Sequence, residues 1–341
     1  MYEKYLKGRD GLILTLSDAK GTELQNAAEE RVEPVPGNTL TVSLDVNIQK
    51  YAEQAAYQVM EKKGAKAVSV IVMNPRNGEI YAMVNVPEFD LNDPFTLNVE
   101  SGGLTGTELQ DARNKMWRNR CINDTYEPGS TFKILTMSAA MEEGLINMNT
   151  TYTCTGGIHV SDAHHHCTGT HGTQTLKVAT GNSCNPAFVK IGQALGAEKF
   201  YDYLEDFGFL EKTGIDMQGE MDTSSLIWPR EDFNTVQLAT ASFGQRFQVT
   251  PIQLITAASA VINGGHLMQP YVVSQVTDGE GNVLQHNEPN EVRQVVSAQT
   301  SERCRAILEK VVDGGTGQEC PGGGLPPSAA RPAPPETALE T

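Results

Sequence analysis

The sequence lacks long hydrophobic runs, a surplus of basic charge and a dense cysteine framework. No apolar stretch in its 341 residues approaches the roughly 18 that a membrane-spanning helix needs. The formal net charge of −16 would repel phosphate groups, so we expect no nucleic-acid partner. Six irregularly spaced cysteines are too few for a disulfide scaffold. Met1 is followed by Tyr-Glu-Lys-Tyr rather than by a signal peptide, so we expect any export signal or membrane anchor to lie outside this chain.

What the sequence does contain is a globular core between two segments of different composition. Residues 39–318 alternate strand-like and helical periodicities, and hairpin signals such as Asn77-Gly78 connect the strands. This pattern predicts an α+β fold with a mostly antiparallel sheet flanked by helices. Residues 1–38 are polar and end in prolines, as expected of a linker that follows an earlier module. Residues 319–341, rich in Pro, Ala and Gly, are expected to be disordered.

Hydrophobic periodicity sets the elements expected inside the core. Helices are expected over residues 47–63, 130–143, 186–195, 198–207, 252–262 and 298–312, and strands over 12–16, 39–45, 67–73, 80–86, 271–276 and 283–286. Two segments show no regular period. Leu91–Asp111 is expected to be a long surface loop, and Thr151–Gln174 an irregular stretch rich in Gly, His and Thr.

Ser130 and Lys133 lie three residues apart at the start of an apolar helix. Residues at this spacing share one face of a helix, so the Lys133 amine can reach the Ser130 hydroxyl. A serine hydroxyl needs an adjacent base to act as a nucleophile, and a lysine can be that base when desolvation lowers its pKa. Ser130 could instead be an ordinary helix cap, but a capping box would have Glu or Gln at position 133. The tetrad is therefore a candidate acylation site.

A second polar cluster, Asn182-Ser183-Cys184-Asn185-Pro186, precedes another predicted helix. Helix capping and an Asn-Pro turn would also explain these residues. As chemistry, the Ser183 hydroxyl can relay a proton, and the Asn185 carboxamide can hold both a lysine ammonium and a substrate amide. Ser-x-x-Lys and a Ser-x-Asn triad are the first two motifs of penicillin-binding proteins and class A β-lactamases.

On these motifs the chain resembles the transpeptidase domain of a class B penicillin-binding protein, of the division and sporulation type. The resemblance runs over most of residues 39–317 and includes Asn74-Pro75, Trp117–Arg120, Tyr126–Lys133 and Ser242–Gln245. It implies the penicillin-binding fold. Residues 1–11 resemble the end of the pedestal module that precedes this domain in the family, so we expect the chain to be truncated at both ends.

The resemblance implies a role for each motif residue. Ser130, beside Gly129 in the substrate site, would be acylated by the D-alanyl-D-alanine end of a peptidoglycan stem peptide, and Lys133 would take its proton. Ser183 would relay a proton to the leaving D-alanine, while Asn185 would hold the substrate amide and Lys133. The amine of a second stem peptide would resolve the acyl-enzyme into a cross-link, and β-lactams would stall at the acyl stage. No metal or organic cofactor is implied.

The family's third motif, a Lys-Thr-Gly on an edge strand of the cleft, marks the main departure. Gly315-Thr316-Gly317 follows the last predicted helix and resembles a tripeptide that precedes the motif in the family. Beyond Gln318 the Pro/Ala/Gly-rich segment stands where the family has Lys-Thr-Gly and further strands. A shifted reading frame or a truncation would produce this ending. Loss of one oxyanion donor already costs roughly 10²–10³ in rate. We therefore expect this chain to be inactive or nearly so.

A His- and Cys-rich stretch offers two further hypotheses. Its members include the preferred ligands of zinc, but their spacing matches no standard zinc finger, so we assign no metal; they are Cys154, His159, His164–His166, Cys167 and His171. Cys167 and Cys184 form a candidate redox pair, since a disulfide inside the Ser-x-Asn motif would freeze that loop. Two unrelated thiols are the alternative reading.

Other functional classes share this fold. A non-catalytic penicillin-sensing or scaffold protein would carry the same two motifs, and no attached signalling segment is visible. A β-lactamase would need a deacylating glutamate loop, for which we find no convincing sequence. For the full-length protein the resemblance implies work at the extracytoplasmic face of the bacterial plasma membrane. Its implied partners are peptidoglycan stem peptides, β-lactams, a membrane glycosyltransferase and division or sporulation proteins.

Overall fold

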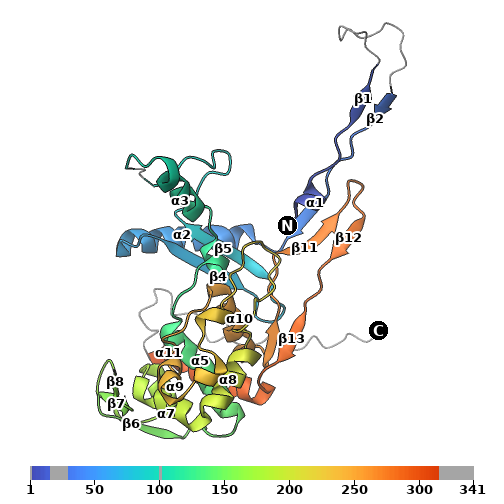
Figure 1. The fold of residues 1–341 in the computed structure, drawn as a ribbon. Coiled ribbons are helices and arrows are strands. Elements are labelled where there is room, and N and C mark those ends of the chain that lie inside the picture. Colours follow the sequence, from blue (N-terminus) through green and yellow to red (C-terminus); the bar gives the residue numbers. More distant parts are fainter. Residues whose placement is uncertain (1, 16–29, 100–101, 315–341) are drawn as a thin grey trace, which may run out of the picture.

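The computed structural model describes residues 2–15, 30–99 and 102–314, and the structural statements below concern these residues. Gly315-Thr316-Gly317 and the segment 319–341, which we expect to be disordered, lie outside them. Figure 1 shows a helix-rich body from which two hairpins extend. In this part of the chain, no helix combines the length and the apolar character needed to cross a membrane.

The N-terminal residues and a distant C-terminal hairpin share one sheet. After the short helix α1 (Glu3–Leu6), strands β1 (Leu12–Leu14) and β2 (Glu30–Val32) pair antiparallel and point away from the body (Figure 1). Strand β3 (Thr39–Val42) then pairs antiparallel with β11 (Val273–Thr277), which also pairs with β12 (Val283–His286). The hairpin expected over residues 271–286 is therefore confirmed, and it anchors the start of the chain.

One amphipathic helix lies against a two-stranded hairpin. Helix α2 (Val46–Lys63) begins after Asp45, whose carboxylate accepts hydrogen bonds from two backbone N–H groups of the first turn. Strands β4 (Val68–Met73) and β5 (Ile80–Val86) pair antiparallel, as the Asn-Gly turn predicts. Alanines of the helix pack on alternate residues of β5. Together these residues form a small separate core, comprising Ala52, Ala56, Ala82, Val84 and Val86.

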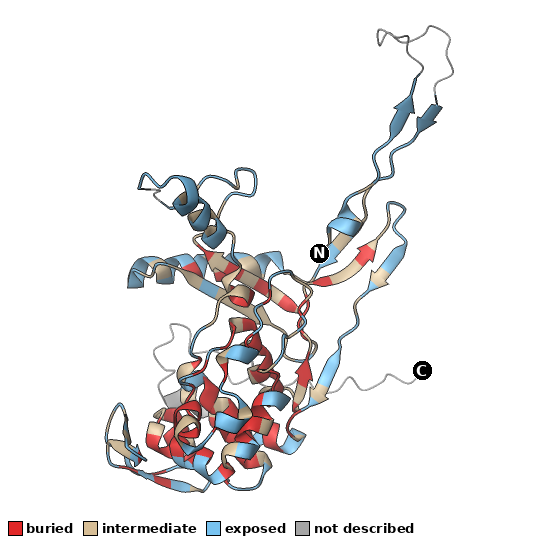
Figure 2. Ribbon diagram, viewed as in Figure 1, coloured by how far each residue is buried: buried red, intermediate tan, exposed pale blue. Residues whose placement is uncertain are grey.

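The main core lies in the helical part of the molecule, where Figure 2 shows most of the buried residues. Its central helix α5 (Lys133–Glu142) has eight of ten residues buried and is surrounded by other elements. Those in contact with α5 include the 3₁₀ turn η1 (Gly129–Phe132) and helices α7 (Asn185–Leu195), α8 (Ala197–Asp206), α10 (Pro251–Ile262) and α11 (Ala298–Gly314). The same part of the molecule contains α4 (Arg120–Asn123), α6 (Leu176–Gly181), α9 (Thr235–Ala241), the 3₁₀ turns η2 (Ser224–Leu226) and η3 (Arg230–Asp232), and the strand pair β10 (His266–Met268) and β13 (Glu291–Gln294).

Two expectations for irregular segments are wrong. Helix α3 (Gly106–Met116) overlaps the expected loop, and because none of its residues is buried, no apolar stripe marks it in the sequence. The stretch expected to be irregular forms two antiparallel strand pairs, β6 (Thr151–Cys154) with β9 (Gly172–Thr175) and β7 (Gly157–Val160) with β8 (Ala163–His166). Each of these strands has only four residues, and Gly and His interrupt the segment, so its sequence lacks the sustained alternation by which longer strands are recognised.

Candidate active site

The Ser130 hydroxyl and the Lys133 amine lie next to each other at the mouth of helix α5. Ser130 belongs to the 3₁₀ turn η1, and Lys133 is the first residue of α5. In a 3₁₀ turn residues i and i+3 eclipse, which brings Lys133 Nζ to 3.2 Å from Ser130 Oγ. Ser130 is exposed, whereas Lys133 is only 3% exposed. An exposed hydroxyl therefore lies next to a buried amine.

The turn that carries Ser130 is held from both sides. On the inner side, the Phe132 ring packs 5.4 Å from the ring of Phe209 and 4.9 Å from that of Phe247, measured between centroids. On the outer side, the Gly129 N–H donates to the Gly244 carbonyl over 2.8 Å. Both anchors are buried tertiary contacts, so the position of Ser130 depends on the core rather than on the loop alone.

Gly244 is a supporting residue that motif reasoning did not single out. Its φ of +83° lies in the left-handed region that favours glycine. A side-chain carbon there would stand 2.0 Å from the Gly129 carbonyl oxygen, far inside van der Waals contact. Only a glycine allows this close backbone approach beside Ser130. Gly244 belongs to the Ser242–Gln245 block on which the family resemblance partly rests. Its physical role, however, depends on a contact with a segment far away in the sequence.

The Ser-x-Asn loop meets Lys133 from the opposite side. Lys133 Nζ lies 2.7 Å from the Ser183 carbonyl oxygen, 2.8 Å from Ser183 Oγ and 2.8 Å from Asn185 Oδ1. A neutral amine has two N–H donors and one lone pair. The carbonyl and amide oxygens can only accept, so they can take both N–H groups. The lone pair is then left for a hydroxyl proton, from Ser130 or from Ser183.

The surroundings of Lys133 favour its neutral form. Desolvation by burial is the largest effect and lowers the pKa of Lys133 to about 8, against an opposing influence from the nearby Cys167 and Cys184 thiols. The ammonium form therefore loses its proton more readily than an exposed lysine would. A base that holds a lone pair near neutral pH is what activation of a serine hydroxyl requires.

Ser183 adopts an unusual backbone conformation. Its φ of +50° is in the left-handed region, which costs a residue with a side chain about 1 kcal/mol or more. The loop is held by hydrogen bonds from the Ser183 N–H to the Thr180 carbonyl and from the Cys184 N–H to the Ala179 carbonyl, each 3.0 Å. This conformation lets one residue present both its carbonyl and its hydroxyl to Lys133.

Asn185 links the site to a neighbouring hairpin. Its Nδ2 donates to the His166 carbonyl over 2.9 Å while its Oδ1 accepts from Lys133. The structure thus brings together Ser130, Lys133, Ser183 and Asn185, with Gly129 adjacent to Ser130.

A Lys-Thr-Gly does occur in the sequence, at Lys212-Thr213-Gly214, far upstream of Gly315. It lies in an irregular segment rather than on an edge strand. The Thr213 N–H and Oγ1 both donate to the Glu220 carboxylate over 2.6 Å. Lys212 and Thr213 line a small cavity with Gln253, not with Ser130 or Lys133. This tripeptide therefore does not lie where the resemblance expects the third motif, on an edge strand beside Ser130.

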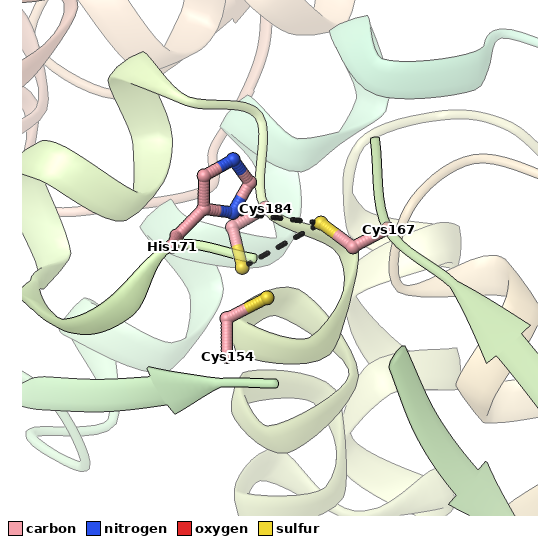
Figure 3. Close-up of side chains that lie close together, drawn as sticks. All are labelled: Cys154, Cys167, His171 and Cys184. Atoms are coloured by element: carbon pink, nitrogen blue, oxygen red, sulfur yellow. Dashed lines mark hydrogen bonds between the residues drawn. The ribbon is translucent and has the colours of Figure 1, made fainter. Parts of the chain in front are cut away.

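The cysteines and one histidine of the His- and Cys-rich stretch converge beside the Ser-x-Asn loop. Figure 3 shows Cys154, Cys167, His171 and Cys184 pointing toward one another, and their potential ligand atoms lie within 4.8 Å of one another. Sγ of Cys167 is 3.9 Å from Sγ of Cys184, so the candidate redox pair is adjacent, and both thiols are free. The remaining histidines of the stretch lie apart from this group, on the β7–β8 hairpin.

Comparisons with known proteins agree with this geometry. Residues 68–323 match the penicillin binding protein transpeptidase domain. Stage V sporulation protein D of Bacillus subtilis is 36% identical over 321 residues, which cover 93% of this chain and 47% of that protein. PbpB of Mycobacterium tuberculosis is 28% identical, with 90% of this chain and 43% of that protein covered. This chain thus spans less than half the length of these relatives.

Solved structures show the same fold. The crystal structure of penicillin binding protein 3 from Mycobacterium tuberculosis, complexed with ampicillin, superposes with a TM-score of 0.72 at 28% identity, over 83% of this chain and 59% of that one. Penicillin binding protein 2X from Streptococcus thermophilus gives a TM-score of 0.75 at 27% identity, over 91% and 43% of the two chains. The chain therefore belongs to the transpeptidase domain family of the class B penicillin-binding proteins.

Proposed function

We propose that this chain carries the serine acyl-transfer site of a peptidoglycan D,D-transpeptidase. The observation that carries the proposal is the position of Lys133 Nζ, within 3.2 Å of polar atoms of Ser130, Ser183 and Asn185 at once. Family membership supports it, since a relative bears the name probable peptidoglycan D,D-transpeptidase and another was crystallised with ampicillin.

In the first half-reaction the Lys133 amine takes the Ser130 proton as Oγ attacks the carbonyl of the penultimate D-alanine. The bond from this carbon to the nitrogen of the terminal D-alanine breaks, and Ser183 passes a proton from Lys133 to that nitrogen. D-Alanine leaves, and Ser130 carries the peptide as an ester. Asn185 holds the substrate amide while it keeps Lys133 in place.

In the second half-reaction the amine of another stem peptide attacks this ester. A new amide forms, the ester bond breaks and Ser130 Oγ regains a proton, which leaves two cross-linked peptides. A β-lactam enters the same first step, but ring opening keeps its leaving group tethered, so the acyl stage persists. In the full-length protein we place this reaction at the extracytoplasmic face of the plasma membrane, beside a membrane glycosyltransferase and division or sporulation proteins.

The rate expected of the 341-residue chain is low. The family resemblance expects Lys-Thr-Gly downstream of Gly315-Thr316-Gly317, but beyond Gln318 the sequence is rich in Pro, Ala and Gly. In the Lys-Thr-Gly that does occur, Lys212-Thr213-Gly214, the Thr213 hydroxyl donates to Glu220. Without the donor from that strand, acylation should be slower by at least roughly 10²–10³. The nucleophile and its base are nevertheless in contact, so we expect slow acylation at Ser130.

A time course with a fluorescent penicillin, followed by peptide mapping, tests the two parts separately. We expect slow labelling at Ser130 that disappears in the Ser130→Ala variant, at a rate at least two orders of magnitude below that of the PbpB transpeptidase domain measured alongside. Absence of label from Ser130 after prolonged exposure would contradict the serine acyl-transfer site. Labelling as fast as that of PbpB would contradict only the expected low rate.

A further inference from the structure

Three thiols and one imidazole meet beside the Ser-x-Asn loop, and neither half-reaction uses them. Cys154 and Cys184 have no exposed surface, and Cys167 and His171 are half-buried. The four residues come from separate parts of the chain: the end of β6, the residue after β8, the residue before β9 and the residue before α7. Four such groups are rarely buried together without a common partner, because thiolate and imidazole are strong metal ligands.

Backbone hydrogen bonds set the positions of these groups before any ion is present. In the β6–β9 ladder Cys154 pairs with Gly172, which places His171 at the end of the neighbouring strand. The Cys167 N–H donates to the Gly156 carbonyl over 2.9 Å, which brings Cys167 back above the strand that carries Cys154. The hairpins therefore order most of the four ligands before an ion binds, so binding costs less conformational entropy.

The distances between ligand atoms fit a tetrahedral ion. With metal–sulfur bonds of about 2.3 Å and a metal–nitrogen bond of about 2.0 Å, a tetrahedron has S···S edges of about 3.8 Å and S···N edges of about 3.5 Å. The observed distances are 3.9 Å from Cys167 Sγ to Cys184 Sγ and 3.6 Å from Cys167 Sγ to His171 Nδ1. No ligand atom is more than 4.8 Å from another, so small rotamer adjustments close the remaining edges.

From this cluster we infer a structural zinc(II) site with Cys154, Cys167, His171 and Cys184 as its four ligands. A set of three cysteines and one histidine is typical of closed zinc sites, which leave no open position for substrate or water. Three thiolates and a neutral imidazole would give the bound ion a net charge of −1. The ion would tie β6 and the β7–β8 hairpin to the loop that begins α7.

The zinc ion would also restrain the candidate active site. This part of the inference rests on the proposed function. Cys184 is the residue between Ser183 and Asn185, so the ion would fix the middle of the Ser-x-Asn loop. Cys167 adjoins His166, whose carbonyl accepts the Asn185 hydrogen bond. One ion would thereby hold both partners of that contact.

Metal content tests the site independently of catalysis. The full chain is expressed with added zinc, purified under reducing conditions and desalted, and its zinc is measured against protein by mass spectrometry. We expect one zinc per chain in the wild type and in Ser130→Ala, and almost none in a Cys154→Ser, Cys184→Ser double variant. Cys304→Ser, which removes a buried thiol outside the cluster, and His164→Ala, on the exposed β8 strand, should keep it.

A folded wild type without zinc would overturn the inference. A full zinc content in the double variant would also overturn it, and so would loss of zinc from His164→Ala. Because ligand variants can fail to fold, a second measurement uses the wild type alone. Cobalt(II) in the site should give thiolate charge-transfer and tetrahedral d–d bands, and X-ray absorption of the zinc form should show three sulfur neighbours and one nitrogen. A first shell without sulfur would sink the inference.

Discussion

The buried Lys133 leads to a prediction in which stability and activity respond differently. Lys133→Met keeps the length of the side chain and removes the amine. Burial lowers the Lys133 pKa from 10.5 to about 8. At neutral pH the folded protein therefore holds a buried ammonium, which lowers the free energy of unfolding by about 3 kcal/mol. The variant removes this cost but leaves the Ser183 carbonyl and Asn185 Oδ1 without a donor, which costs about 1–3 kcal/mol. We therefore expect the unfolding free energies at pH 7 to agree within about 2 kcal/mol.

The dependence on pH gives a sharper result. The unfolded lysine binds its proton more tightly than the folded one, so stability rises as pH increases from about 8 to 10.5, and below pH 8 the cost persists in full. Across that window the wild type should gain about 3 kcal/mol relative to the variant, with a slope of at most about 1.4 kcal/mol per pH unit. Titrating groups that do not interact with Lys133 are common to both proteins and cancel in the difference.

Urea unfolding followed by circular dichroism, at steps between pH 7 and 10.5, measures this difference. Ser130 labelling by a fluorescent penicillin on the same samples should fall by roughly 10²–10⁴ in the variant, because the general base is lost. Lys190→Met, which removes an exposed amine from α7, is the matched control and should follow the wild type in both assays. Parallel stability curves for wild type and Lys133→Met would refute the desolvation of Lys133 in the folded protein.

Three further predictions concern the same site. The rate of Ser130 labelling in the wild type should rise with pH and level off near pH 8, where Lys133 becomes neutral; a rate independent of pH between 6 and 9 would contradict the assigned base. Asn185→Asp places a carboxylate on the amine and favours the ammonium form, so the pH at which labelling levels off should rise measurably. Gly244→Ala should lower both labelling and melting temperature, because the new methyl would stand 2.0 Å from a backbone carbonyl oxygen. Gly281→Ala, with a similar φ of +88° but open space, should cost only about 1 kcal/mol in stability.

Local sequence was sufficient to predict the features that depend only on residues close together in the chain. The Ser130–Lys133 contact could be predicted from a spacing of three residues at the start of a helix. The helices over residues 47–63 and 252–262 were predictable because their apolar periodicity and caps lie within the segments themselves; Asp45 and Thr250 both cap as expected of their residue types.

Features that depend on contacts between distant segments escaped prediction. Gly244 matters because it touches Gly129, more than a hundred residues away, and no local pattern announces such a contact. Helix α3 has no buried face to give it a period, and it is anchored instead by side chains that donate to backbone carbonyls, such as Trp117 Nε1 to Pro94. The cysteine cluster needed the strand register of β6 and β9, which short Thr- and Gly-rich strands do not reveal.

The strain at Ser183 explains why the Ser-x-Asn loop has so many restraints. A left-handed serine persists only when its surroundings over-determine it. Lys133 holds the Ser183 carbonyl, the His166 carbonyl holds Asn185, and the cluster around Cys184 holds the residue between them. Each restraint acts on a different residue of the tripeptide. Three independent contacts therefore determine the geometry of the loop, and only the one to Lys133 belongs to the proposed reaction.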